Sequence, residues 1–210
     1  MSDPRLQLQT MARMQVAHNV EVHAAWETQG YRYYRAIWVE CAELLDHFGW
    51  KWWKRQQGEL DQVRLELVDI WHFGLSDLLR AGVAEDELAT ALADLPDAAE
   101  AGDPERFRLA VETLAEVTLR ERRFLLDPFL DAMRALPMSR DELFDLYVGK
   151  NVLNSFRQQN GYQDGSYRKT WGGREDNEHL VELLAELDCT PTDVPDRLTA
   201  ALDERYRALA

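Results

Sequence analysis

Apolar side chains recur every three to four residues along nearly the whole chain, which is the spacing that buries one face of an α-helix. Runs in which apolar and polar residues alternate between turn signals, as they do in β-strands, do not recur. The pattern therefore predicts an all-α fold. The expected helices cover about 6–23, 33–48, 60–80, 104–134, 139–161, 177–187 and 195–209, with further helix in the Ala- and Leu-rich stretch that begins at 84.

Capping and turn residues mark the ends of several of these helices. Asp103, which precedes a proline, is typical of an N-cap. Ser139 and Glu142 have the spacing of a capping box at the start of another helix. Pro128 is expected to kink the helix that it interrupts. Residues 161–173, which are rich in Gly, Tyr, Lys and Arg, are expected to form a structured loop.

The composition is that of an ordinary globular protein with a strong acidic bias. Of the 210 residues, 46% are hydrophobic and 30% are charged, and the net charge is −14. A chain this acidic is a poor binder of nucleic acid or of anionic membranes, both of which attract basic surfaces. Two cysteines are too few for a disulfide framework. No apolar run reaches the ~18 residues of a membrane span, and the first residues lack a signal-peptide profile. We therefore expect a soluble, cytoplasmic protein that binds neither nucleic acid nor membrane.

Two pairs of acidic residues interrupt the apolar surfaces of two consecutive expected helices. Glu40 and Glu43 lie in the second helix, and Glu66 and Asp69 lie in the third. Residues three apart share a helical face, and helices joined by a short connection tend to pack antiparallel, so the four carboxylates are expected to face one another. Four desolvated carboxylates repel unless a cation joins them. All-oxygen ligation favours Mg²⁺, Mn²⁺ or Ca²⁺.

Two other interpretations of these acids are open at this point. The acids could pair with arginines or lie on solvated helix faces, as most acids on helices do. A ferritin-like di-iron site is the second, but it requires two Glu-x-x-His motifs, and the chain has one partial match, Asp69 with His72. His47 and His72 are therefore expected to be packed or hydrogen-bonded helix residues and not metal ligands.

A basic, amide-rich segment at 147–177 contrasts with the acidic remainder of the chain. Lys150, Asn154 and Arg157 are spaced to form one stripe on a helix, and Lys169 follows among glycines. Arginine forks and lysine point charges suit phosphate oxygens. Carboxylates that hold a metal and basic groups that hold the same phosphate would together form a phosphoryl-transfer or diphosphate-cleaving site. The alternative is a basic face that neutralises acids elsewhere. A P-loop is excluded, because the chain has no Walker A motif.

Four motifs follow one another in an order that matches a known family. They are Glu40-Cys-Ala-Glu43-Leu-Leu-Asp46, Trp50-Lys51-Trp52-Trp53-Lys54, Glu66-Leu-Val-Asp69-Ile-Trp-His-Phe73 and nearly the whole run from Gly149 to Asn177. The last is long and specific in composition. Together with Gln15 and Asn19 in the first expected helix, these motifs resemble the dimeric deoxyuridine triphosphatases of the all-α NTP pyrophosphatase superfamily.

The resemblance implies a fold and an activity. The activity is hydrolysis of dUTP to dUMP and pyrophosphate, which removes dUTP and supplies dUMP, and hydrolysis of dUDP as well. The implied fold is a helical bundle that forms one domain over 1–210, with a variable helical region at about 81–138 that could be mobile. The resemblance also implies a homodimer.

The resemblance also implies which residues form the site. More than one Mg²⁺ ion is expected, and the implied ligands are Glu40, Glu43, Glu66 and Asp69. One of the first two glutamates would also activate the attacking water, and we favour Glu40. The residues implied to contact phosphate and sugar are Lys150, Asn154, Arg157, Tyr162 and Lys169.

The base pocket implied by the resemblance consists of Gln15, Asn19 and a tryptophan of 50–53, for which we take Trp53. The physical argument agrees, because residues four apart share a helical face and an amide offers both the donor and the acceptor that the edge of uracil requires. Two solvated amides are the alternative. The tryptophans could stack on a base or seal the helix connection, and we expect Trp52 to seal it.

Two other functions are compatible with these residues. One is a related all-α nucleoside triphosphate pyrophosphatase of different or relaxed base specificity. The other is a non-enzymatic helical module whose acids form salt bridges and whose basic stripe docks a partner. The aromatic residues around 31–38 favour an apolar dimer interface. The glycines of 161–173 favour a loop that is mobile without ligand and closes over substrate.

Overall fold

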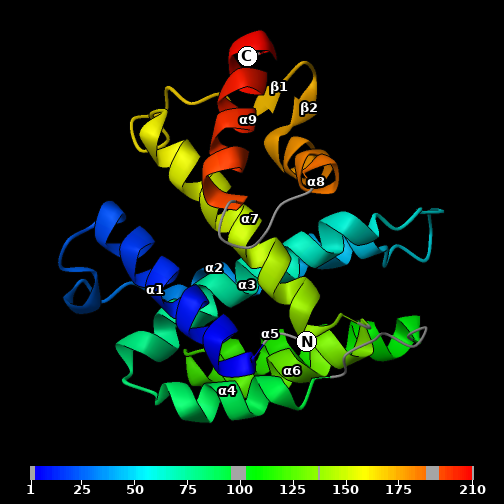
Figure 1. Cartoon of the computed structure of the whole chain (residues 1–210). Coiled ribbons are helices and arrows are strands. Elements are labelled where there is room, and N and C mark those ends of the chain that lie inside the picture. Colours follow the sequence, from blue (N-terminus) through cyan, green and yellow to red (C-terminus); the bar gives the residue numbers. More distant parts are fainter. Residues whose placement is uncertain (1–2, 96–102, 137, 188–193, 210) are drawn as a thin grey trace. The chain divides into compact units, whose positions relative to one another are not determined.

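The computed structural model describes residues 3–95, 103–136, 138–187 and 194–209, and nearly all of their regular structure is helical (Figure 1). The all-α prediction is therefore confirmed. The elements in chain order are α1 (Pro4–Val22), the 3₁₀ helix η1 (Trp26–Thr28), α2 (Tyr33–Phe48), α3 (Leu60–Arg80), α4 (Glu85–Ala93), α5 (Pro104–Glu121), α6 (Leu126–Ala135), α7 (Arg140–Gln159), β1 (Thr170–Trp171), β2 (Arg174–Glu175), α8 (Asp176–Glu186) and α9 (Val194–Leu209). None of the described helices is long and apolar enough to cross a membrane.

The chain forms two compact units, Met1–Phe144 and Asp145–Ala210, and the boundary falls within α7. The expectation of one domain over 1–210, and that of a variable middle region, stay predictions. Residues 101–102, which precede the expected N-cap Asp103, lie outside the described residues.

The first unit is organised around α3. Its side chains are buried along almost the whole helix, because α2 packs along one side and α1 along another. Trp71, in the middle of α3, is fully buried and stacks on Phe129 of α6 with ring centroids 5.3 Å apart. Gly74 lets Phe124 approach, because a Cβ at this position would lie 2.8 Å from three carbons of the ring. This tight packing fixes α3 and any chemical groups that it carries.

The second unit packs the last turns of α7, the β1–β2 hairpin, α8 and α9 around an aromatic core. Trp171 of β1 is fully buried and stacks on His179 of α8, with ring centroids 5.2 Å apart. Its indole Nε1 donates to the carbonyl oxygen of Arg168 at 2.7 Å. Tyr206 of α9 covers another side of the same indole at 5.1 Å. The indole therefore joins the hairpin to two helices.

The predicted helix starts are confirmed where capping residues marked them. The side chain of Asp103 accepts a hydrogen bond from the backbone N–H of Glu105 at 2.9 Å, at the start of α5. At the start of α7, the backbone N–H of Ser139 donates to Glu142 at 2.8 Å, and the N–H of Glu142 donates to Ser139 Oγ at 3.1 Å. Both bonds of the capping box are present, because each side chain accepts from the other's backbone.

Two local predictions are wrong. Pro128 does not kink a long helix, because the chain breaks before it: α5 ends at Glu121, Arg122 adopts a left-handed conformation with φ of 55°, and α6 begins at Leu126. Pro128 lies in the first turn of α6, where a missing N–H breaks no helical hydrogen bond. The segment 161–173 is not wholly a loop, since its last residues form β1 and the hairpin turn at Gly172 and Gly173, both at positive φ.

Candidate functional site

Of the four carboxylates that the sequence predicts to face one another, three gather in the first unit. Oxygen atoms of Glu40, Glu43 and Glu66 all lie within 4.8 Å of one another. Glu66 is buried, Glu40 is half-buried and Glu43 is exposed, so the carboxylate cluster (these three residues) opens from the interior toward solvent. Asp69, one turn further along α3 than Glu66, is outside this group of three. Its charge nevertheless acts on Glu40.

Burial and repulsion change the protonation of this cluster. Burial, followed by the charge of Asp69 and a hydrogen bond with Glu66, raises the pKa of Glu40 to about 9. Without a cation the cluster therefore holds a proton at neutral pH, because the alternative is several negative charges in a poorly solvated space. A divalent cation would remove the same repulsion by replacing the proton. Its donor atoms are all carboxylate oxygens, which is the ligand set that hard divalent cations prefer.

The histidines near these acids act as the sequence predicts. His47 Nδ1 lies 2.7 Å from a carboxylate oxygen of Glu59, and its Nε2 lies 3.9 Å from Glu66. His72 Nδ1 lies 3.0 Å from Gln15 Oε1. Within the part of the chain that the structure describes, the group of potential metal ligands contains only the three glutamates and no histidine. The arrangement therefore gives the di-iron interpretation no support.

The two amides of α1 meet inside the first unit and are not solvated. Gln15 Nε2 donates to Ser76 Oγ at 2.9 Å, and Asn19 Nδ2 donates to the same oxygen at 3.0 Å. Gln15 Nε2 also lies 3.2 Å from Asn19 Oδ1. Both amides are buried, so the alternative of two solvated side chains is wrong. Sequence reasoning missed Ser76, although its spacing places it on the same stripe of α3 as Asp69 and His72.

The tryptophans between α2 and α3 are more exposed than the sequence suggested. Trp52 is 90% exposed, so the expectation that it seals the helix connection is wrong. Trp53 is 57% exposed and contacts Trp50 and Trp52 edge-to-face, with ring centroids 5.2 and 5.4 Å away. Trp50 Nε1 donates to Asp46 at 3.1 Å, and this bond attaches the group of tryptophans to the end of α2. A face of Trp53 therefore remains available to a planar group.

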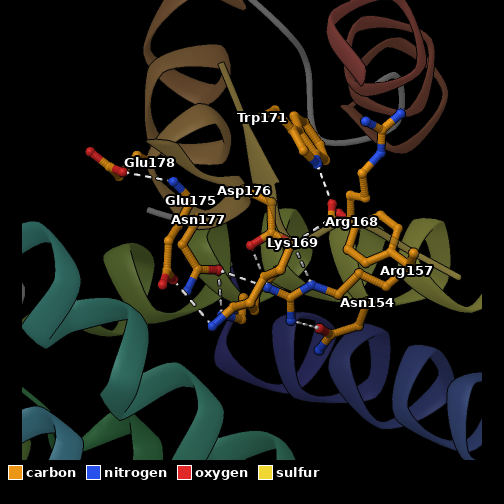
Figure 2. Close-up of polar contacts among 11 residues, drawn as sticks. Asn154, Arg157, Arg168, Lys169, Trp171, Glu175, Asp176, Asn177 and Glu178 are labelled. Carbon is orange, nitrogen blue, oxygen red and sulfur yellow. Dashed lines mark hydrogen bonds and ion pairs between the residues drawn. The ribbon is translucent and has the colours of Figure 1, made fainter. Parts of the chain in front are cut away.

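The predicted basic stripe forms on α7 in the second unit (Figure 2). Arg157 forks onto Asp176 with Nε and Nη2 at 2.8 and 2.7 Å from its two carboxylate oxygens, and Nη1 donates to Asn154 at 3.1 Å. Lys150 Nζ donates to Asn177 Oδ1 at 2.7 Å. Lys150 is only 1% exposed. Sequence reasoning missed the acceptors Asp176 and Asn177. The signal for them was the run Arg174-Glu175-Asp176-Asn177 at the start of a helix.

Asp176 is the buried negative charge that pairs with the basic stripe on α7. Burial alone would raise the pKa of Asp176, but the hydrogen bonds and charge of Arg157, with a further bond from the Tyr167 hydroxyl at 2.8 Å, hold it below its usual range. The carboxylate is therefore ionised over the physiological range. Burial and the same carboxylate raise the pKa of Tyr167, which keeps the phenol protonated as a donor. The guanidinium of Arg157 is thus fixed in orientation by a buried negative charge.

Two predicted phosphate residues lie at the surface of the second unit. Lys169 Nζ forms an ion pair with Glu175 at 3.1 Å, and both side chains are about half exposed. Tyr162 is also half-exposed, and the guanidinium of Arg157 lies 6.0 Å from the centre of its ring. These two side chains are therefore accessible to a ligand, whereas Arg157 and Lys150 are buried and are held by Asp176 and Asn177.

A family model described as dUTPase matches residues 7–162, which include the amides of α1, the carboxylates of α2 and α3, and the stripe on α7. None of the curated proteins compared with the chain matches it.

Proposed function

The chain belongs to the dimeric, all-α dUTPase family, and on that premise we propose that its dUTP diphosphatase activity depends on Mg²⁺ held by the carboxylates of α2 and α3. The observation that carries this proposal is the approach of Glu40, Glu43 and Glu66 to within 4.8 Å. We include Asp69 as a fourth ligand, because its charge already acts on Glu40. The non-enzymatic module considered above does not fit the family.

The reaction adds water across the phosphoanhydride between the α- and β-phosphates. One P–O bond forms and one breaks, dUMP and pyrophosphate result, and the proton lost by water goes to a base. Bound divalent cations would supply positive charge to the phosphate oxygens during this step. We propose Glu40 as the base, because its carboxylate lies in the cluster that would hold the ions and therefore close to water bound there. The same bond is present in dUDP, so we propose that dUDP is also hydrolysed.

The basic residues of the second unit are proposed to hold the phosphates and the sugar. They are Lys150, Asn154, Arg157, Tyr162 and Lys169. Support comes from the oriented guanidinium of Arg157 and from the exposed charge of Lys169. Preorganised donors of this kind stabilise charge on phosphate without having to reorient when the substrate arrives. The loop at 161–173 is proposed to close over the substrate.

The buried amides of the first unit are proposed to read the base. Uracil presents an acceptor, a donor and an acceptor along one edge, and an amide can match either kind of group. Ser76 joins Gln15 and Asn19 at one point, so their orientation is set before the base arrives. Trp53 is proposed to stack on the ring. A homodimer and a cytoplasmic location complete the proposal, and light scattering would check the first by giving twice the chain mass.

The proposal is tested by identifying products. The protein is incubated with Mg²⁺ and with dUTP, dUDP, dCTP, dTTP or UTP in turn, and the products are separated by anion exchange. We expect dUMP with pyrophosphate from dUTP, dUMP with phosphate from dUDP, and little reaction of the other nucleotides. Comparable turnover of dCTP or dTTP would replace this proposal with the relaxed-specificity pyrophosphatase. Turnover of dUTP that is unchanged by a chelator would contradict the role of the metal.

A further inference from the structure

A polar cavity in the first unit shares no lining residue with the proposed dUTP site. Its volume is about 360 Å³, within the range of small-molecule pockets. It lies where η1 leads into α2, and Arg80 at the end of α3 and Arg122 after α5 complete its wall. Other lining residues are Glu27, Tyr31, Arg32 and Tyr34.

The cavity is electropositive in a chain whose net charge is −14. Three guanidinium groups line it against one carboxylate, that of Glu27. Arg80 is held in place, because it pairs with Asp77 and donates to the carbonyl oxygen of Tyr31 at 2.7 Å. Within the described parts of the chain, Arg32 and Arg122 form no ion pair and no side-chain hydrogen bond. Two of the three charges are thus available to a ligand.

The backbone adds to this positive potential. The first residue of α2 follows Arg32, whose side chain makes no capping bond, and the first turn of this helix carries no acidic residue. The positive end of the helix dipole is therefore uncompensated at the cavity. The Tyr34 hydroxyl accepts a hydrogen bond from Arg35 Nε at 3.3 Å. That bond, together with the charges of Arg35, Arg122 and Arg32, lowers the pKa of Tyr34, which places the phenol in a positive environment.

We propose that this cavity binds a small phosphate-bearing anion at a site separate from the dUTP site. Guanidinium groups match phosphate oxygens in geometry and charge, and unpaired helix N-termini bind the same groups. Tyr31 and Tyr34 offer aromatic surface beside the charges, so a nucleotide and a free polyphosphate both meet the chemistry of the wall. The shared requirement is a phosphoryl group near Arg32, Arg122 and the start of α2.

The proposal is tested with a reporter inside the cavity. The full chain is labelled with fluorotyrosine, and the Tyr34 resonance is assigned by its loss in Tyr34→Phe. Inorganic pyrophosphate and AMP are titrated separately in metal-free buffer, so that the carboxylate cluster does not recruit them. We expect the Tyr34 resonance to shift and saturate at millimolar ligand or below. A shift with both ligands identifies a nucleotide site, and a shift with pyrophosphate alone identifies a site for inorganic polyphosphate.

Matched arginine variants separate a built site from general attraction. Arg32→Gln and Arg122→Gln should each weaken binding at Tyr34 about tenfold or more, because each removes a charge-assisted contact. Arg123→Gln removes the same charge from the neighbouring exposed residue that does not line the cavity, and it should leave the affinity unchanged. The proposal is overturned if Tyr34 responds to neither ligand. It is also overturned if all three variants weaken binding equally.

Discussion

Metal binding to the carboxylate cluster should release a proton, and its strength should therefore depend steeply on pH. The pKa of Glu40 is raised to about 9 by burial, by the charge of Asp69 and by the bond with Glu66. Because pH 7 lies about two units below this pKa, the Glu40 carboxyl is about 99% protonated there. A cation that binds there must displace the proton, which lowers its apparent affinity about 100-fold at pH 7. Each unit of pH restores about tenfold, or about 1.4 kcal/mol, until the pKa is reached.

Titration calorimetry with Mg²⁺ or Mn²⁺ measures both the metal affinity and the number of protons released on binding. Affinity is recorded at several pH values between about 6 and 8, in pairs of buffers with different ionisation enthalpies, so that the number of released protons follows from the difference in heat. We expect about one proton per cluster at neutral pH. Glu40→Gln carries no titratable proton there, so it should bind metal more weakly, with little pH dependence and little proton release. Glu112→Gln, an exposed glutamate on α5, should behave as the unaltered protein.

An affinity in the unaltered protein that is constant over this pH range, without proton release, would refute the reasoning. The pH dependence of the stability of the metal-free protein provides a second check, on the direction of the Glu40 pKa shift. The raised pKa means that the native protein binds more protons than the unfolded chain between about pH 4.5 and 9. The free energy of unfolding should therefore be largest below this range and fall as pH rises through it. Glu40→Gln should remove that slope.

Three other substitutions test particular residues. Glu43→Gln should lower kcat for dUTP at least ~100-fold without unfolding the protein, as expected for a lost electrostatic group, and rates at limiting Mg²⁺ equal to those of the unaltered protein would show that Glu43 is not a ligand. Gly74→Ala should lower the free energy of unfolding in urea by about 1–3 kcal/mol, because its Cβ would meet the Phe124 ring at 2.8 Å; an unchanged midpoint would contradict this. Arg157→Ala should cost about 3–5 kcal/mol in the same assay, because it leaves Asp176 buried without its partner. Adding Asp176→Asn should recover part of that loss. An unchanged loss of stability would show that the unpaired charge of Asp176 is not its cause.

The helices and the approach of the glutamates on α2 and α3 could be predicted because their signals are local. Glycines at 49 and 82 follow α2 and α3, and both adopt positive φ in the structure. Acids three residues apart must share a helical face, so the short connection between the two helices was enough to bring Glu40 close to Glu66. Asp69 lies outside the group of three, and its spacing from Glu66 in the sequence does not show this.

The remaining features depend on contacts between distant parts of the chain. The partner of Arg157 is Asp176, which the β1–β2 hairpin returns to α7. The spacing of residues along α7 cannot show that a later segment folds back against this helix. The break before Pro128 was missed because Arg122, an ordinary helix former, adopts the left-handed conformation that glycine usually marks. Trp52 was expected to seal a connection because aromatic residues are commonly buried, yet its neighbours leave it in solvent.

The most direct test of the central claim is to locate the cation itself. Crystals of the protein grown with Mn²⁺ and a non-hydrolysable dUTP analogue would be measured at a wavelength where manganese scatters anomalously. The account predicts manganese within bonding distance of Glu40, Glu43 and Glu66, with phosphate oxygens of the analogue on the same ions. Bound analogue with manganese elsewhere, or with the three carboxylates still sharing a proton, would contradict it.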